Sequence, residues 1–373
     1  MMTKKRPYLI APKLIEQPTW GGEYILRIKD WVEKQDFLGK KIGQSYELFS
    51  GSKLLLKVTD SQDEDFKGEL GSPDESTIFN DTGYQKNQDY IELSEATALY
   101  KNIPLIKINQ SKGNSFQIHI KKSDGRWVPK MESCYYLEDG VATFGIKKNA
   151  DLSDYRNTCL IIDKKMNELS LKVKNKKISI EEARERASSL IKELNPWQYV
   201  NVHVVKKYSI GPGVLGVQHS WEEDPRFPQG LVNYEVQQDV MDPVSTIRSF
   251  DKGKIKDDGT IRKIHIEDYF KYLDRDPDHN DLEKMAPKRQ ANRLLTTEYY
   301  CLDILEIENE IINSTNNSFS HLFVRDGKIS VEADEGSIIL SKGHSCFVPE
   351  IVSEYIIKPL EGGTVVLKTF IES

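Results

Sequence analysis

Cysteine is scarce in this chain of 373 residues, and none of the four cysteines forms a C-x-x-C pair. Scattered thiols favour a reduced, cytoplasmic protein over a disulfide framework. Long apolar runs are missing too. The run Tyr8-Leu9-Ile10, which follows a basic N-terminus, is far too short for a signal peptide or a membrane span. We therefore expect a cytoplasmic protein that does not enter a membrane.

A basic excess is also absent. The formal net charge is -6, so no surplus of cations exists to neutralise the phosphates of a nucleic acid. A small anionic ligand remains compatible with this charge, because it needs only a few local cations. Hydrophobic residues make up 38% and charged residues 29% of the chain. These proportions are typical of a globular protein, and the length allows more than one domain.

Alternating apolar and polar residues predict strands over much of the chain. Leu105-Ile106-Lys107-Ile108 and Phe116-Gln117-Ile118-His119-Ile120 follow period 2, as half-buried strands do. Asp139-Gly140 predicts a hairpin between two further strands. From residue 299 onward, short strands recur at even spacing, including a turn at Asp326-Gly327, which is typical of a barrel or jelly roll.

A helical segment interrupts these strands. Ser179 is followed three residues later by Glu182, a capping box, and apolar residues then recur at helical spacing until Pro196. We predict helix within residues 151–197 and a short helix over 266–273. Two strand-rich blocks separated by helices indicate two barrels.

One acidic stretch has little periodicity. Residues 60–89 are rich in Gly, Ser and Asp, and we interpret them as a long surface loop, with a lid as the alternative.

Four polar side chains form a candidate metal site. Gln117 and His119 are two residues apart on a predicted strand, so their side chains project from the same face. Burying an amide and an imidazole there costs free energy unless their polar atoms have partners. Glu132 stands just before the next strand, and His219 follows the glycine-rich loop 211–216. Two imidazoles, a carboxylate and an amide oxygen suit a borderline cation such as Zn²⁺. Taken alone, a Q-x-H pair is more often a pair of hydrogen-bonded strand residues than a metal site, and His219 alone would be a solvated loop histidine.

The remaining strand histidines serve as a comparison. His203, His321 and His344 have no second ligand at a suitable spacing. We interpret all three as structural.

Several motifs in order resemble the type I phosphomannose (mannose-6-phosphate) isomerases of the cupin superfamily, in their short bacterial form. Together they are much more specific than any one of them. The matching segments are residues 12–16, Trp20-Gly21-Gly22, residues 42–47, residues 104–107, residues 115–119, residues 130–132, residues 216–219, residues 234–238 and Arg248.

The resemblance implies a mainly β bicupin fold, two antiparallel barrels or jelly rolls with a helical insert, and one Zn²⁺ per chain. The implied ligands of this ion are Gln117, His119, Glu132 and His219. The implied divisions are a metal-binding N-terminal cupin (1–150 and 198–260), a helical insert (151–197) and a C-terminal cupin without metal (261–373).

The family reaction interconverts mannose 6-phosphate and fructose 6-phosphate by proton transfer between C1 and C2. Negative charge then develops on oxygen, which a Lewis-acid metal or a cation stabilises, while a carboxylate shuttles the proton. By the resemblance, Arg248, Glu235 as base and Lys130 are catalytic. Ser115 and Lys254 are the implied ligands of the substrate phosphate, a dianion that hydroxyls and basic side chains bind well.

The sequence departs from the family pattern in places. Ile120-Lys121-Lys122 replaces the proline and acidic residues that follow Q-V-H in the family, and Val214 stands where a proline is expected. The spacing from Glu235 to Arg248 is about three residues longer, and a displacement of about 1 Å can cost on the order of 10²-fold in rate. The alternatives are therefore a non-catalytic metal-binding cupin that senses or binds a sugar phosphate, and a bicupin scaffold without metal. We expect a monomer or a homodimer.

Overall fold

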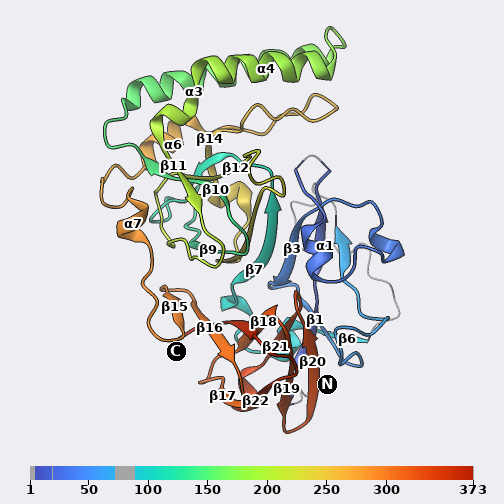
Figure 1. Cartoon of the computed structure of the whole chain (residues 1–373). Helices are drawn as coiled ribbons and strands as arrows, with labels where there is room; N and C mark the ends of the chain where they lie inside the picture. The colour runs from blue at the N-terminus through green and yellow to red at the C-terminus, as the bar shows by residue number, and fades with distance from the viewer. Residues whose placement is uncertain (1–4, 19, 72–88, 373) are drawn as a thin grey trace.

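The computed structural model describes residues 5–18, 20–71 and 89–372. These residues form a mainly β structure of four sheets, in which neighbouring strands are antiparallel except for the parallel pair β2 and β5. The predicted β-rich class is therefore confirmed. In Figure 1 the C-terminal strands gather at one end of the molecule, and the two long helices lie at the other.

Two of the sheets surround the site described below. The six-stranded sheet has the order β5 (Glu69–Gly71), β2 (Lys13–Glu16), β3 (Ile42–Leu48), β7 (Leu105–Ser111), β13 (Leu231–Gln237), β9 (Glu132–Tyr136). The five-stranded sheet has the order β11 (Val200–Val205), β10 (Gly140–Ile146), β12 (His219–Glu222), β8 (Phe116–Ile118), β14 (Ile247–Phe250).

The other two sheets contain the C-terminal strands. The eight-stranded sheet has the order β15 (Arg293–Thr296), β16 (Cys301–Ile307), β23 (Thr364–Phe370), β18 (Ser320–Asp326), β21 (Ser345–Val348), β1 (Tyr8–Ala11), β4 (Lys53–Leu55), β6 (Tyr90–Glu92). The four-stranded sheet has the order β17 (Ile311–Ser314), β22 (Glu354–Pro359), β19 (Lys328–Ala333), β20 (Gly336–Ser341). Three early strands thus extend a sheet of the C-terminal half, because β1 pairs with both β21 and β4.

The helices are mostly short. The α-helices are α1 (Tyr24–Ile28), α2 (Leu93–Ala96), α3 (Leu152–Lys174), α4 (Ile180–Leu194), α5 (Asp242–Ser245), α6 (Ile266–Tyr272) and α7 (Leu282–Met285). The 3-10 turns are η1 (Gln35–Phe37), η2 (Tyr100–Asn102), η3 (Pro196–Tyr199) and η4 (Glu350–Val352). Among the described residues, none of the helices combines the length and apolar character that crossing a bilayer requires.

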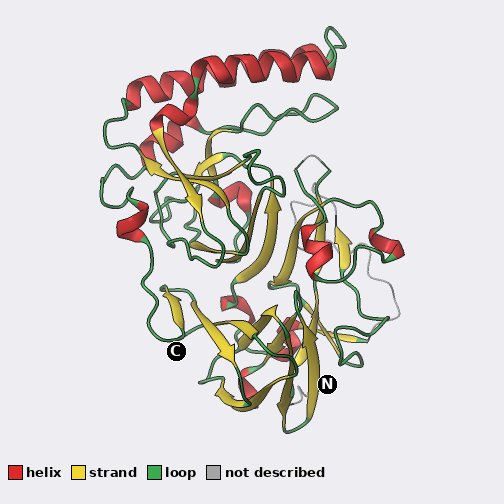
Figure 2. Cartoon of the chain, viewed as in Figure 1, coloured by secondary structure: helices red, strands yellow, loops and turns green. Residues whose placement is uncertain are grey.

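The predicted helical segments are present. α3 and α4 lie within residues 151–197, and α6 lies within 266–273. The Ser179 hydroxyl caps α4 by accepting a hydrogen bond from the backbone N–H of Glu182 at 3.1 Å. Buried residues of α3 recur every three or four positions and pack into the second hydrophobic core, beside β8 and β14. Figure 2 shows these helices together at one end of a molecule otherwise built of strands.

The predicted hairpin at Asp139-Gly140 is wrong. β9 pairs with β13, whereas β10 pairs with β11 and β12, so the turn carries the chain from one sheet to another. The turn at Asp326-Gly327 does the same between β18 and β19, with Gly327 at φ 79°. Two sheets that bury a common core need such crossings. A local turn signal does not distinguish a crossing from a hairpin.

Part of the acidic stretch 60–89 is built into the fold. Asp60 bridges to Ile339, and β5 pairs with β2. Residues 72–88, to which most of the loop or lid interpretation applies, lie outside the described residues.

Strand β13 explains how a polar site forms beside a large core. Val232, Tyr234 and Val236 belong to the main hydrophobic core, and the Tyr234 ring packs 5.3 Å from that of Phe323 on β18. Because side chains alternate along a strand, the residues between them point the other way. Glu235 and Gln237 consequently line a cavity.

Candidate metal centre and adjoining cavity

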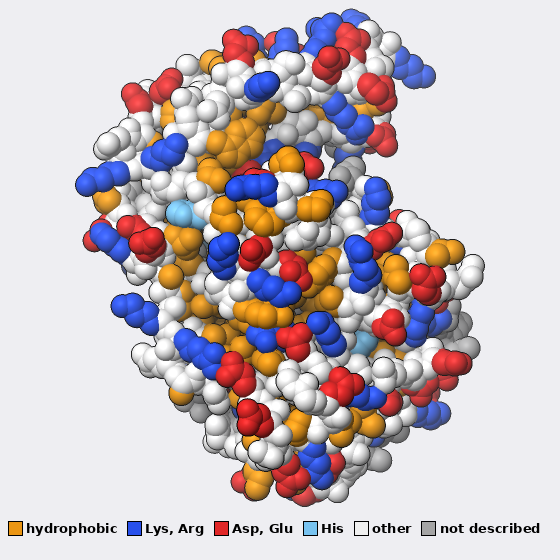
Figure 3. Space-filling view, viewed as in Figure 1, with side chains coloured by type: hydrophobic (Ala, Val, Ile, Leu, Met, Phe, Trp, Pro, Cys, Tyr) orange, Lys and Arg blue, Asp and Glu red, His pale blue; other side chains and the backbone are white. Residues whose placement is uncertain are grey.

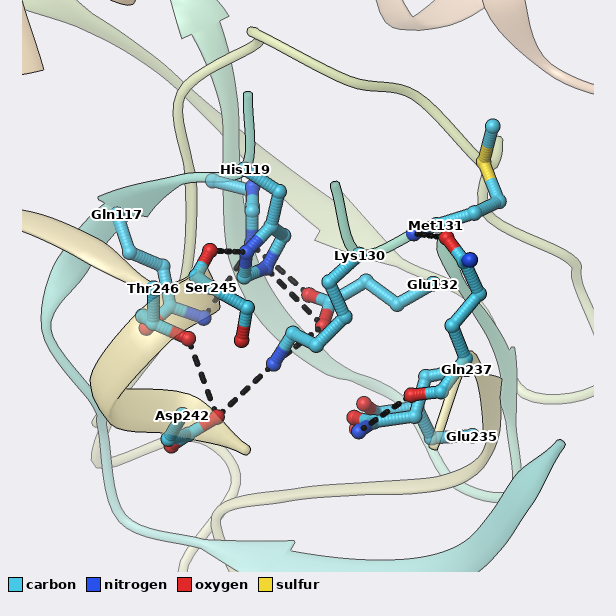
Figure 4. A network of polar contacts seen from close by, with 12 residues as sticks. Gln117, His119, Lys130, Met131, Glu132, Glu235, Gln237, Asp242, Ser245 and Thr246 are labelled. Atoms are coloured by element: carbon cyan, nitrogen blue, oxygen red, sulfur yellow. Dashed lines mark hydrogen bonds and ion pairs between the residues drawn. The ribbon is translucent and has the colours of Figure 1, made fainter. Parts of the chain in front are cut away.

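Three side chains from two different sheets converge on one point. His119 follows β8 directly, Glu132 begins β9 and His219 begins β12. Their ligand atoms lie within 4.8 Å of one another. The Nε2 atom of His119 is 3.1 Å from Oε2 of Glu132, and Nε2 of His219 is 2.8 Å from Oε1 of Glu132. Figure 4 shows His119 and Glu132 pointing toward each other.

The second ring nitrogen of each histidine is held by the backbone. Nδ1 of His119 donates to the carbonyl of Ser245 at 2.8 Å, and Nδ1 of His219 donates to the carbonyl of Val217 at 3.0 Å. Burial lowers the pKa of His119 to about 4, so this ring is neutral at pH 7 and its single proton is on Nδ1. This arrangement orients the other nitrogen of each ring as metal-binding histidines require.

A cation fits this arrangement. Nε2 of His119 is buried and has no hydrogen-bond partner among the described residues. In the neutral ring it presents a lone pair to a carboxylate oxygen of Glu132, and two lone pairs repel. A divalent ion between them replaces the repulsion with attraction. The residue types are those of a Zn²⁺ site.

Gln117 completes the predicted group. It pairs with His219 across β8 and β12, and its Nε2 atom lies 3.3 Å from Nε2 of His219. Rotating the carboxamide by half a turn places its oxygen there instead. All four residues predicted from the sequence as metal ligands are thus brought together.

A cavity of about 300 Å³ opens beside this group. Its walls come mainly from the six-stranded sheet and from the segment 240–248. The charged residues that line it are Lys13, Lys107, Lys130, Glu132, Glu235, Asp242, Arg248 and Arg262. On the face of the molecule shown in Figure 3, positive and negative side chains are interspersed, so the charged wall of the cavity is a local feature.

Asp242 links two cations of the cavity wall. Its carboxylate lies 3.0 Å from Nζ of Lys130 and 3.3 Å from the guanidinium of Arg248. Lys130 is also 3.2 Å from Glu132. Burial opposes the charged form of Lys130, but the Asp242 and Glu132 carboxylates outweigh it and raise the pKa of the amine. Lys130 is therefore a cation beside the metal group, as Figure 4 shows.

Glu235 is held on the opposite wall. Its Oε2 atom accepts a hydrogen bond from Asn109 at 2.7 Å, and its Oε1 atom is 3.3 Å from Nζ of Lys107. Lys107 also donates to Gln237 at 2.9 Å. Burial raises the pKa of Glu235 although Lys107 opposes this shift. The carboxylate thus faces the cavity in a fixed orientation.

Neither of the two predicted phosphate ligands lines this cavity, but each donates a hydrogen bond to a residue that does. Ser115 is buried and donates to the Gln117 carboxamide oxygen at 3.1 Å. Lys254 donates to the carbonyl of Gly113, and burial lowers the pKa of its amine to about 8. Arg262 does line the cavity.

Sequence patterns did not predict three charged residues of the cavity wall, which are Lys107, Asp242 and Arg262. Lys107 interrupts the apolar strand 105–108, which was an available signal. Asp242 and Arg262 lie in loops or short helices without a pattern to mark them.

Fold and site together define a mainly β protein with a buried two-histidine, one-carboxylate group suited to a divalent cation. Residues 290–367 match a family described as mannose-6-phosphate isomerase, cupin domain. The resemblance indicated by the motifs is thereby confirmed. None of the curated protein sequences matches the chain.

Solved structures show the same fold over the whole chain. The mannose 6-phosphate isomerase of Bacillus subtilis is 14% identical, with a TM-score of 0.63 over 98% of this chain and 100% of that one. A putative mannosephosphate isomerase of Archaeoglobus fulgidus is 15% identical, with a TM-score of 0.63 over 100% of both. The Salmonella typhimurium mannose 6-phosphate isomerase, solved with fructose 6-phosphate and zinc, is 12% identical, with a TM-score of 0.61 over 98% of this chain and 100% of that one.

Proposed function

We propose that this chain is a metal-dependent isomerase that interconverts mannose 6-phosphate and fructose 6-phosphate. The observation that carries the proposal is the convergence of His119, Glu132 and His219 beside a cavity that also contains Lys130 and Arg248. The solved relative with fructose 6-phosphate and zinc supports the choice of substrate.

Gln117, His119, Glu132 and His219 would hold a single Zn²⁺. When bound, this ion supplies Lewis-acid stabilisation of negative charge on a substrate oxygen. The backbone carbonyls of Ser245 and Val217 keep the two imidazoles oriented toward it.

The charged side chains of the cavity have complementary tasks. Lys130 and Arg248 stabilise the oxygen on which negative charge develops, and Asp242 holds these two cations in place. Glu235 moves the proton between C1 and C2 as the general base. Its burial favours proton uptake, and Asn109 fixes its orientation.

The altered spacing between Glu235 and Arg248 is compatible with this assignment. Both residues line the same cavity, and the chain between them contains α5, which carries Asp242. A purely sensing cupin would not require both residues at the cavity. Their common location therefore favours an enzyme over the sensing alternative. Ser115 and Lys254 would reach the phosphate only after their present hydrogen bonds are exchanged, and Arg262 is a further candidate.

We further propose two cupin barrels. The N-terminal one (1–150 and 198–260) holds the metal, residues 151–197 are a helical insert, and the C-terminal one (261–373) lacks a metal. Strands β1, β4 and β6 are exceptions to these boundaries, because they pair within the sheet of the C-terminal half. A cytoplasmic monomer or homodimer that acts in carbohydrate metabolism completes the proposal.

The test is a coupled assay of fructose 6-phosphate formation from mannose 6-phosphate. The purified protein is assayed untreated, after treatment with a chelator, and after Zn²⁺ is added back. We expect turnover that the chelator abolishes and zinc restores. Folded, zinc-loaded protein without turnover would reject the isomerase. Binding of mannose 6-phosphate without turnover would then favour the sensing alternative.

A further inference from the structure

A second, larger recess lies on the other side of two segments that wall the cavity. It measures about 880 Å³. Gln110 and Lys112 line this recess, whereas Ser111 between them lines the cavity. Gly21 and Gly22 likewise line the recess, whereas Trp20 lines the cavity. We call this recess the outer groove.

Three cations of the outer groove lack an acidic partner. Arg27, Lys41 and Lys112 line it, and none of them forms an ion pair or a side-chain hydrogen bond among the described residues. A single solvent-exposed cation on a protein surface has little energetic significance. Three unpaired ones on separate elements around one recess form an electropositive site.

The other charged groups of the groove are largely neutralised elsewhere. Glu138 is 3.0 Å from Lys207 and accepts a hydrogen bond from the Tyr24 hydroxyl at 3.0 Å. Lys342 is 2.9 Å from Asp326. Glu23 is the remaining acid of the lining. The three free cations and Glu23 therefore leave a net charge of about +2, which matches a phosphate dianion.

Backbone contacts hold Lys41 and Lys112 near the turn at residues 20–22, and Arg27 lies in α1, which begins just after this turn. Gly22 bridges to Ile42, which places Lys41 beside the turn, and the backbone N–H of Lys112 donates to the carbonyl of Trp20 at 3.1 Å. Arg27 is three residues after Tyr24 in α1, so the two share a face of the helix.

The neutral lining of the groove suits the organic part of a ligand. Tyr24, Ile28 and Pro228 offer apolar surface, and the carboxamides of Gln110 and Gln229 lie among them. Gln110 is buried and held by Tyr24 N–H, which donates to its oxygen at 2.8 Å, so this wall is preformed. Apolar surface combined with a few fixed polar groups is usual for a small-molecule site.

We propose that the outer groove binds a small phosphorylated molecule, whose phosphate dianion contacts Arg27, Lys41 and Lys112. This site is separate from the metal group and does not depend on the isomerase assignment. Its charge comes from residues that the cavity does not use, and its ligand would be recognised without a metal.

Lysine footprinting tests the site directly. The metal-free protein is acetylated with a water-soluble acetylating reagent, with and without inorganic phosphate as the probe, at an ionic strength held constant with sodium chloride. Mass spectrometry then gives the acetylation rate of each lysine. We expect phosphate to slow acetylation of Lys41 and Lys112 several-fold. Lys164 and Lys177 are exposed controls that form no ion pair with another described residue, and their rates should not change.

A matched pair of variants locates the effect. Arg27→Gln should abolish the protection of Lys41 and Lys112, because one of the three cations is removed. Arg186→Gln, in an exposed helical arginine paired with Glu182, should leave the protection intact. Unchanged melting temperatures would show that both variants are folded. Equal protection of all exposed lysines, or protection that survives in Arg27→Gln, would overturn the proposal.

Discussion

The Nδ1 atom of His119 lies 2.8 Å from the carbonyl oxygen of Ser245. Ser245 ends α5, which begins at Asp242, and β14 with Arg248 follows two residues later. One short segment therefore holds a histidine of the metal group in orientation and also carries two charged residues of the cavity wall. Pairing of β14 with β8 also places Arg248 opposite Gln117, so its position relative to the metal group depends on these tertiary contacts and not only on its distance from Glu235 along the sequence.

Metal retention should depend on the converging histidines. We expect His119→Gln and His219→Gln to weaken zinc binding by on the order of 10²-fold or more, because each removes a ligand. Zinc content after dialysis, measured by mass spectrometry of the metal, checks this. His203→Gln is the matched control, since His203 lies on β11 outside the group. Retention equal to that of the control would contradict the metal site.

The Asp242 carboxylate should be needed to position Lys130 and Arg248. Its side chain is 59% exposed, but its partner Lys130 is only 3% exposed. Because Lys130 keeps Glu132 as a second partner, we expect Asp242→Asn to lower the melting temperature only modestly. Loss of the negative charge between the two cations should lower kcat by about 10- to 10²-fold. Steady-state kinetics with mannose 6-phosphate measures this. Asp258→Asn, in an exposed loop where the carboxylate contacts Thr260, should have no effect on kcat.

The buried pair of Lys107 and Glu235 allows function to be separated from stability. Their side chains are 10% and 2% exposed, so Glu235→Gln should lower the free energy of unfolding by about 3 kcal/mol, because a buried ammonium loses its partner. It should also abolish turnover. The double variant Lys107→Met with Glu235→Gln should regain stability but stay inactive.

Urea unfolding and the coupled assay measure the two effects of these substitutions. A double variant that regains activity would exclude Glu235 as the base. Lys107→Met alone completes the cycle and gives the interaction energy of the pair.

His321 should make the fold sensitive to acid. It is fully buried, with Nδ1 3.1 Å from the Tyr234 hydroxyl, and burial lowers its pKa to about 3. Its pKa in the unfolded chain is about 6.5. The unfolded chain therefore binds more protons between these values, so the stabilisation is complete above about pH 6.5 and is lost as the pH falls toward 3.

Unfolding free energies at pH 7 and pH 5 measure this contribution. His321→Gln should reduce their difference, with a limiting slope of about 1.4 kcal/mol per pH unit for one proton. His279→Gln is the control, because the His279 side chain is 45% exposed. An equal pH dependence in the wild type and His321→Gln would show that this histidine does not couple folding to pH.

Short-range patterns predicted most of the individual elements. The alternation over residues 105–108 became part of β7, and the helical spacing after Ser179 became α4 with its predicted cap. Both patterns reflect which face of a single element is buried, and this is a local property. The turn at Asp139-Gly140 does not form the predicted hairpin, because β9 pairs with β13 and β10 pairs with β11. The packing of the two sheets determines these partners, and the sequence of the turn does not.

The sequence by itself determined the residue types of the metal group and the strands that carry them, since ligands two apart on a strand share a face wherever that strand packs. Only the tertiary structure decided that Lys107 and Asp242 line the cavity and that Ser115 and Lys254 instead donate hydrogen bonds to its lining residues. It also decided that β1 joins a sheet of the C-terminal half. The physical reason is that strand pairing and charge pairing between distant segments depend on the packing of two sheets about a common core. The local periodicity of the sequence does not predict which distant segments will pair.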